Sequence, residues 1–230
     1  PLYNPDGYHY GSVWPLFTGW AAVGEYRYHH AQSAYANLRS NALLALDGAL
    51  GHITEVLSGD FYQPLSTSSP HQIWSAAMVV SPLLRGLFGL DTDAMTHQLR
   101  FAPHVPVEWK SFELHDIRVA GATIDLKYSH TEDGITLEMQ RTGRDDCTLE
   151  FSPAVSRRAE VAGAEINGRR VAIRMERNQE DQHVSVRFPV NGGSSTLHIR
   201  LRNYFSYSIF SSLPALGERS QGLRVLSESW

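Results

Sequence analysis

The chain has 230 residues, of which 42% are hydrophobic and 19% charged, the composition of an ordinary soluble globular protein. A net charge of −4 and a pI near 6.3 argue against a nucleic-acid-binding protein, which usually carries a basic face. No apolar run reaches the roughly 20 residues of a membrane-spanning helix, and the single Cys147 excludes an internal disulfide framework.

The chain opens at Pro1 with no Met, no basic stretch and no signal-peptide core. We therefore expect it to be part of a longer polypeptide. The compartment stays open, with the cytoplasm favoured. Charged residues are rare before residue 92 and common after it, whereas 13 of the 24 aromatic residues fall in the first part. This change predicts two domains, 1–92 and 93–230.

The first part has the spacing of three helices. Apolar residues recur at three- and four-residue steps in 14–28, 31–50 and 69–89. Pro82 lies inside the third segment and should kink the helix there. The segment 51–68 reads as a long loop rich in Gly, Ser, Thr and Pro, and loops of that length are often functional.

The second part has the alternation of β-strands. Apolar and polar residues alternate in five segments, namely 123–128, 135–141, 170–175, 183–188 and 196–201. Asn167 and Gly168 form a strong hairpin-turn signal between two apolar runs. Regular short strands joined by turns predict an antiparallel β-sandwich.

Two carboxylates in the long loop could carry out sugar chemistry. Glu55 and Asp60 lie near Gln72 and Trp74, which together would form a polar and aromatic surface suited to sugar rings. Glycoside hydrolases typically use a carboxyl pair, roughly 6.5–9.5 Å apart for inversion and about 5–5.5 Å for retention. The alternative is that one or both carboxylates cap a helix or stabilise the loop.

A second group of aromatic and His residues lies between Gly7 and Pro15. It contains His9, Tyr10 and Trp14, just before the first predicted helix. These side chains suit a sugar-binding platform, and they suit plain packing equally well, because Trp and Tyr are highly buried on average.

Three motifs in order resemble the closing segments of glycogen-debranching amylo-α-1,6-glucosidases and related six-hairpin glycosidases. They are Tyr-His-Tyr-Gly-Ser-Val-Trp-Pro from residue 8, Thr-Glu-Val-Leu-Ser-Gly-Asp from residue 54, and Pro-His-Gln-Ile-Trp-Ser-Ala-Ala from residue 70. The segment 99–109 is similar to the join into a C-terminal β-domain in such enzymes. The resemblance covers about residues 7–130.

The resemblance implies the last helices of an (α/α)6 barrel followed by the β-sandwich, with inverting hydrolysis of α-glucosidic linkages. Glu55 matches the family's general base, which activates water. The remaining site residues would contact substrate at the sugar subsites: His9, Tyr10, Trp14, Asp60, Gln72 and Trp74. The family's general acid is an Asp on an earlier helix, and no position here matches it; nothing around Asp6 resembles the motif of that acid. The chain also has Ser58 where the debranching motif usually carries an acidic residue.

The sequence leaves two other functions open. A carbohydrate-binding or structural module without catalysis fits the absent acid, and a disaccharide phosphorylase would share the barrel and β-domains. The expected partners are an oligosaccharide or α-glucan substrate and the missing N-terminal part of the same enzyme. No cofactor is expected. No metal site is expected at His29 and His30 either, because no Cys or acidic ligand stands at a suitable spacing.

Overall fold

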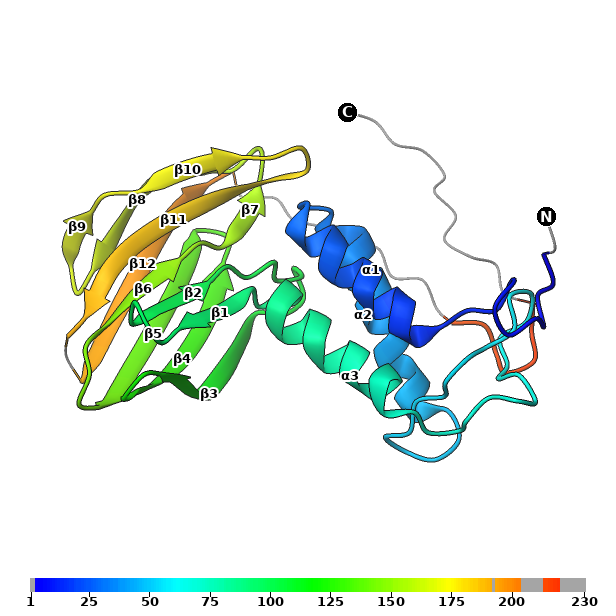
Figure 1. Ribbon diagram of the computed structural model, residues 1–230. Helices are drawn as coiled ribbons and strands as arrows, with labels where there is room; N and C mark the ends of the chain where they lie inside the picture. Colours follow the sequence, from blue (N-terminus) through cyan, green and yellow to red (C-terminus); the bar gives the residue numbers. More distant parts are fainter. Residues whose placement is uncertain (1–2, 192, 204–212, 220–230) are drawn as a thin grey trace. The chain divides into compact units, whose positions relative to one another are not determined.

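The computed structural model describes residues 3–191, 193–203 and 213–219 (Figure 1). These residues pack as two compact units. The first contains residues 3–24, 33–82 and 213–219, and the second contains residues 25–32 together with the described residues from 83 to 203. The predicted domain boundary at residue 92 stays a prediction.

The expected partial (α/α)6 barrel is wrong. The described residues form three α-helices, which are α1 (Pro15–Arg27), α2 (Ala31–Leu43) and α3 (Ile73–Pro82), whereas the rest of the regular structure is mostly strand. A closed barrel of helix pairs needs far more helices than these. In the part of the chain that the structure describes, no helix is long and apolar enough to cross a membrane.

The helices of the first unit pack closely through small residues. Gly19 of α1 lies against Met78 of α3, where an added Cβ would come within 2.3 Å of the Met78 side chain. The buried Asn41 of α2 donates hydrogen bonds to the carbonyls of Pro15 (2.8 Å) and Met78 (3.3 Å). One amide thus joins all three helices.

Helix α3 is shorter than the sequence predicts at both ends. It begins at Ile73 because the backbone of the preceding residues is bound to the long loop: Gln72 N donates to Ile53 O at 2.9 Å, and Glu55 N donates to Ser69 O at 2.9 Å. It ends at Pro82, whose missing N–H breaks the hydrogen-bond ladder, and a single π-type turn, Leu83–Leu87, follows.

The second unit contains two six-stranded sheets that face each other (Figure 1). One has the order β1-β2-β6-β11-β10, with β7 also paired to β11, and the other has the order β3-β4-β5-β12-β8-β9. The strands of the first sheet are β1 (Leu90–Asp93), β2 (Gln98–Phe101), β6 (Cys147–Phe151), β7 (Ala154–Ser156), β10 (Arg174–Arg177) and β11 (Asp181–Val190). Those of the second are β3 (Ser111–Val119), β4 (Ala122–Thr131), β5 (Gly134–Gly143), β8 (Glu160–Ile166), β9 (Arg169–Val171) and β12 (Ser194–Arg202).

The core of this unit lies between the two sheets. Every second residue of β4 is buried, from Ala122 to His130, so one face of the strand points inward. Phe101 of β2 meets Phe112 of β3 at a ring-centroid distance of 6.3 Å, and Phe151 of β6 meets Tyr128 of β4 at 6.4 Å. The predicted β-sandwich is therefore consistent with the structure.

Two details of the sheets bear on the sequence predictions. Asn167 and Gly168 make the predicted turn between β8 and β9, both with positive φ (49° and 77°), as a type I′ hairpin requires. The sandwich is mixed rather than purely antiparallel, because β2 and β6 pair in parallel.

Candidate active site

Glu55 lies in the first unit, in the long loop. The stretch of this loop from Ile53 to Ser58 is buried. Short bridges hold this stretch in place. Val13 and Leu57 exchange backbone hydrogen bonds at 2.9 and 2.8 Å, and Leu57 also forms a bridge with Pro64. The loop that carries Glu55 is thus fixed on both sides by extended backbone.

The Glu55 carboxylate is held by two donors. The Tyr8 hydroxyl donates to Oε1 at 2.6 Å, and the Ser69 amide donates to Oε2 at 3.2 Å. Only 8% of Glu55 is exposed. A hydrogen bond to a charged group is worth about 1.5–3 kcal/mol, and here one donor on each oxygen fixes the plane of the carboxylate. Each oxygen keeps a lone pair with which it can accept from water.

Tyr8 remains a donor over a wide pH range. The hydrogen bond to Glu55 raises the pKa of the Tyr8 phenol above its usual value, and desolvation and the charge of Glu55 act in the same direction. A raised phenol pKa means that the proton stays on Tyr8 at and beyond neutral pH. Tyr8 therefore orients the Glu55 carboxylate as a hydrogen-bond donor and keeps its own proton.

Three rings lie together beside this carboxylate. Tyr8 contacts Trp14 edge-on at 4.7 Å, and His9 lies parallel to Trp14 at a centroid distance of 6.2 Å. The Trp14 indole N–H donates to the Tyr8 carbonyl at 3.1 Å. His9 is exposed and Trp14 half-buried, so this predicted platform is both rigid and open to solvent.

Asp60 is placed differently from Glu55. It is half-buried, and its Oδ1 accepts a hydrogen bond from the Tyr3 hydroxyl at 3.3 Å. The preceding Gly59 approaches Gly11 so closely that an added Cβ would lie 2.1 Å from the Gly11 carbonyl oxygen. Only glycine fits there, and this contact joins the Asp60 loop to the segment that carries the rings.

The remaining predicted residues lie at the start of α3 and in the N-terminal loop. The Gln72 side-chain oxygen accepts a hydrogen bond from the adjacent Ile73 amide at 3.0 Å. Trp74 is 40% exposed and Tyr10 is 67% exposed, which is high for aromatic side chains. No interaction among the described residues joins Gln72, Trp74 or Tyr10 to Glu55, so their roles stay predictions.

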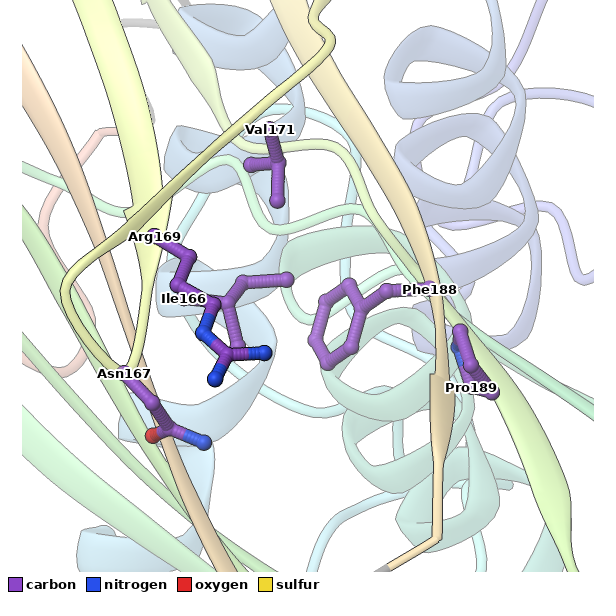
Figure 2. A pocket seen from close by; sticks show the side chains of 6 residues that line it. All are labelled: Ile166, Asn167, Arg169, Val171, Phe188 and Pro189. Carbon is purple, nitrogen blue, oxygen red and sulfur yellow. The ribbon is translucent and has the colours of Figure 1, made fainter.

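The second unit has a hollow of about 520 Å³ lined by residues of β8, β9 and β11 and the turn between β8 and β9 (Figure 2). Its lining consists of Ile166, Asn167, Arg169, Val171, Phe188 and Pro189. None of these is a carboxylate, so the hollow lacks the acid and base groups of glycoside hydrolysis.

Sequence reasoning missed the two donors to Glu55. Tyr8 lies within one of the three motifs but was assigned no role, and Ser69 was predicted only to begin the third helix. In the structure Ser69 uses both its N–H and its carbonyl to pair with Glu55. The spacing of 14 residues across an irregular loop carries no periodic signal that could have revealed this pair.

No protein-family model and no curated protein matches this sequence. Solved glycoside hydrolases are similar to it in structure. An α-L-rhamnosidase from Dictyoglumus thermophilum aligns over 81% of this chain and 21% of its own, with a TM-score of 0.56 and 12% identity. A GH127 β-L-arabinofuranosidase, Ara127N-Se from Geobacillus Stearothermophilus T6, aligns over 79% of this chain and 28% of its own. Its TM-score is 0.39 and its sequence identity 13%.

The chain thus spans about a fifth of the rhamnosidase. The likeness to the arabinofuranosidase is too weak to carry an argument, and neither neighbour is a glycogen-debranching glucosidase. At 12% identity the first likeness shows fold alone. This chain shares its fold with part of a glycoside hydrolase.

Proposed function

We propose that this chain is the part of a glycoside hydrolase that supplies the general base, Glu55. The observation that carries the proposal is the Glu55 carboxylate itself, 8% exposed and held by Tyr8 at 2.6 Å and Ser69 at 3.2 Å. A buried carboxylate with one fixed donor on each oxygen is suited to receive a proton from a positioned water.

The reaction needs a second carboxyl group. In an inverting hydrolase an acid protonates the leaving oxygen, while the base takes a proton from water, which attacks the anomeric carbon. In the debranching glucosidases that this chain resembles, the general acid is an Asp on an earlier helix, and no position of this sequence matches its motif. We therefore place the general acid in a further segment of the same enzyme.

Exposed apolar side chains support a further segment. Phe17 and Trp20 of α1 are 55% and 54% exposed, and Ile73 and Val80 of α3 are 76% and 53% exposed. Large apolar groups gathered on two helices are typical of a surface that another part of the protein covers.

The finer proposal concerns the substrate. The three ordered motifs favour an α-glucosidic linkage of the debranching or exo-glucosidase type, attacked with inversion. The fold neighbour makes α-L-rhamnosides the informative alternative. His9 and Trp14 would stack against the sugar ring, and Asp60, Tyr10, Gln72 and Trp74 would contact its hydroxyls or neighbouring sugars.

The test uses the enzyme with its upstream segment. Wild-type protein and Glu55→Gln are assayed on α-glucosides, a branched α-glucan and α-L-rhamnosides, and the first-formed anomer is followed by proton NMR. We expect wild-type turnover of an α-glucoside with an inverted product, lost in Glu55→Gln. Turnover of another glycoside but not of α-glucosides would show that the proposed substrate is wrong. A product with the retained anomeric configuration would contradict the inverting mechanism.

A second assay separates catalysis from binding. The 230-residue chain is tested alone and mixed with the upstream part. Turnover only in the mixture supports an enzyme whose acid lies upstream. Sugar binding without turnover in either sample would instead favour a carbohydrate-binding module, which the exposed Tyr10 and Trp74 would also suit.

A further inference from the structure

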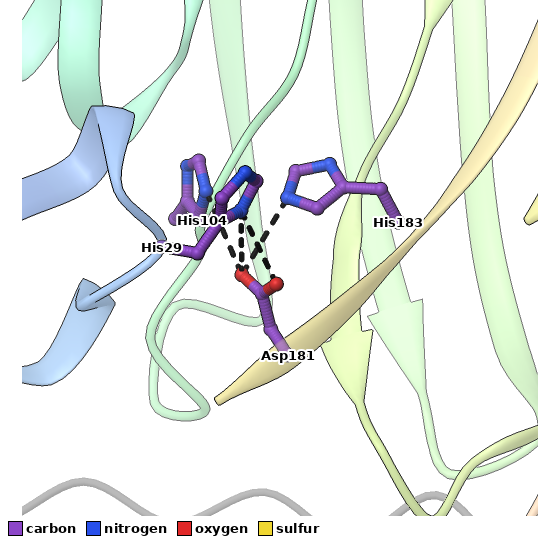
Figure 3. Close-up of side chains that lie close together, drawn as sticks. All are labelled: His29, His104, Asp181 and His183. Carbon is purple, nitrogen blue, oxygen red and sulfur yellow. Dashed lines mark hydrogen bonds and ion pairs between the residues drawn. The ribbon is translucent and has the colours of Figure 1, made fainter. Parts of the chain in front are cut away.

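The second unit contains a group of four potential metal ligands, here called the histidine cluster: His29, His104, Asp181 and His183. One ligand atom from each lies within 4.8 Å of the others. His29 follows α1, His104 follows β2, and the other two are on β11 (Figure 3). His104, Asp181 and His183 have side-chain exposures of 7%, 11% and 5%.

Local geometry brings these side chains together. Asp181 and His183 are two residues apart on a strand and therefore project to the same face. Between them, Gln182 donates to the carbonyls of Ser156 and Ala159. His29 has a positive φ of 65°, a conformation that residues other than glycine rarely adopt.

The three imidazoles surround one carboxylate (Figure 3). The His29 Nδ1 lies 3.2 Å from Asp181 Oδ1, the His183 Nε2 lies 3.5 Å from Oδ2, and the His104 Nε2 lies 3.8 Å from Oδ2. Asn178 Nδ2 donates to Asp181 Oδ1 at 3.1 Å and also lies 3.2 Å from His29 Nδ1. The carboxylate thus has an outer donor that fixes its orientation.

The tautomer of His183 is set by its other nitrogen. His183 Nδ1 lies 2.6 Å from the carbonyl oxygen of Ser152, so Nδ1 carries a proton and donates it. In the neutral ring Nε2 then presents a lone pair toward Asp181. Ligating histidines commonly show this arrangement, with one nitrogen bound to a backbone carbonyl and the other to the metal.

His104 lacks the hydrogen bonds that a buried imidazole requires. Neither of its ring nitrogens, nor Nε2 of His183, makes one with any described residue. A buried imidazole without a hydrogen-bond partner in the described part of the chain has a nitrogen to offer a metal, and the His104 Nε2 lies 3.8 Å from Asp181 Oδ2.

Asp181 provides the negative charge. Three imidazole rings face this one carboxylate, and a cation held between them would satisfy the carboxylate and the nitrogen lone pairs together. A buried polar group left without partners is rare, and each such group calls for an explanation.

We propose that the histidine cluster binds one zinc ion, with His29, His104, Asp181 and His183 as its four ligands. Imidazole and carboxylate are usual zinc ligands, whereas magnesium and calcium prefer oxygen ligands alone. A tetrahedral site with bonds of about 2.0–2.1 Å places its ligand atoms about 3.4 Å apart. The present spread of up to 4.8 Å therefore has to contract by small side-chain rotations.

Four protein ligands make this a structural site rather than a catalytic one, because a catalytic zinc keeps a position for water or substrate. The ion would join three segments that are distant in sequence: the turn around His29, the segment after β2 and the start of β11. The proposal does not depend on Glu55 or on glycosidase activity.

The experiment uses protein purified without a polyhistidine tag, stripped with a chelator and titrated with zinc against a chromophoric competitor. We expect about one equivalent to bind, and His104→Ala and Asp181→Asn to weaken the affinity by about 100-fold or more. His30→Ala is the matched control, since His30 is adjacent in sequence but binds Glu180 outside the cluster. Cobalt(II) added in place of zinc should give the strong visible absorption of tetrahedral coordination.

Three results would overturn the proposal: a folded wild-type chain that binds zinc no more tightly than His104→Ala, an equal loss in His30→Ala, or a cobalt spectrum of octahedral type. If the cluster variants do not fold, X-ray absorption of the zinc-loaded wild-type protein decides. Zinc coordinated mainly by nitrogen atoms, at the distance of a zinc–imidazole bond, would support the site. Zinc coordinated by oxygen atoms alone would contradict it.

Discussion

The Glu55 site and the histidine cluster are both buried and polar, yet their hydrogen bonding differs. Glu55 has a donor on each carboxylate oxygen, Tyr8 and Ser69, and open lone pairs that a water could use. In the histidine cluster, ring nitrogens of His104 and His183 have no hydrogen-bond partner among the described residues. The first arrangement suits the catalytic base that we propose, whereas the second suits the zinc site that we propose.

The strongest test of this contrast removes the Glu55 carboxylate altogether. In the enzyme with its upstream segment, Glu55→Ala should lower kcat by about 10²–10⁴-fold, the usual contribution of a general base. Azide should restore part of the rate, because this anion attacks the anomeric carbon without giving up a proton. The product would be a glycosyl azide, identified by mass spectrometry. A loss of rate that azide leaves unchanged would point to a structural role.

Metal removal probes the other half of the comparison. If zinc binds the folded chain and is present at about 100 times its Kd, it adds about 2.7 kcal/mol to the free energy of unfolding. For a protein of this size that corresponds to a Tm lower by roughly 5–10 °C after chelation. Differential scanning calorimetry of the wild-type chain with and without zinc measures the shift, and His30→Ala should show the same one. An unchanged wild-type Tm would argue against the site.

The Tyr8 hydroxyl allows a smaller change. Tyr8→Phe keeps the ring contact with Trp14 and removes the 2.6 Å hydrogen bond to Glu55. We expect kcat to fall about tenfold with little change in KM, because a lost charge-assisted hydrogen bond disorders the carboxylate. Since the pKa of Tyr8 is raised, any loss of wild-type rate from ionisation of this residue should begin at a higher pH than that at which a free tyrosine ionises. A Tyr8→Phe variant with wild-type kcat would remove the orienting role.

The smallest expected effect concerns the exposed aromatics. Trp74→Ala should raise KM roughly 2- to 10-fold, the range of one aromatic stacking contact, and leave the Tm unchanged. Val80→Ala is the matched control, because Val80 is an exposed apolar residue on the same helix. Equal KM values for the two variants would place Trp74 outside the substrate site.

The sequence allowed the local structure to be predicted better than the architecture. Alternation found β4, β5, β11 and β12, and the turn at Asn167 and Gly168 was confirmed, because strand period and turn chemistry are local properties. The (α/α)6 barrel was inferred from three short motifs, which carry no information on how many helices surround them. The parallel pairing of β2 with β6 also lies beyond any periodic pattern.

The two sites also differed in how much of each could be predicted from the sequence. Glu55 was found because its motif resembles that of a known base, although its donors Tyr8 and Ser69 were not. The histidine cluster was missed because its members come from a helix end, a proline-rich segment and a strand. His29 was considered with the neighbouring His30, and only the two-residue spacing of Asp181 and His183 was a local signal of a shared face.

The most direct test of the account compares the two loop carboxylates in the enzyme with its upstream segment. Glu55→Gln and Asp60→Asn each replace one carboxylate oxygen with an NH₂ group, which removes the negative charge and preserves the shape of the side chain. Steady-state kinetics should show a fall in kcat of about 10²–10⁴-fold for Glu55→Gln. Asp60→Asn should instead act mainly on KM. A larger loss of kcat for Asp60→Asn than for Glu55→Gln would contradict the assignment of Glu55 as the base.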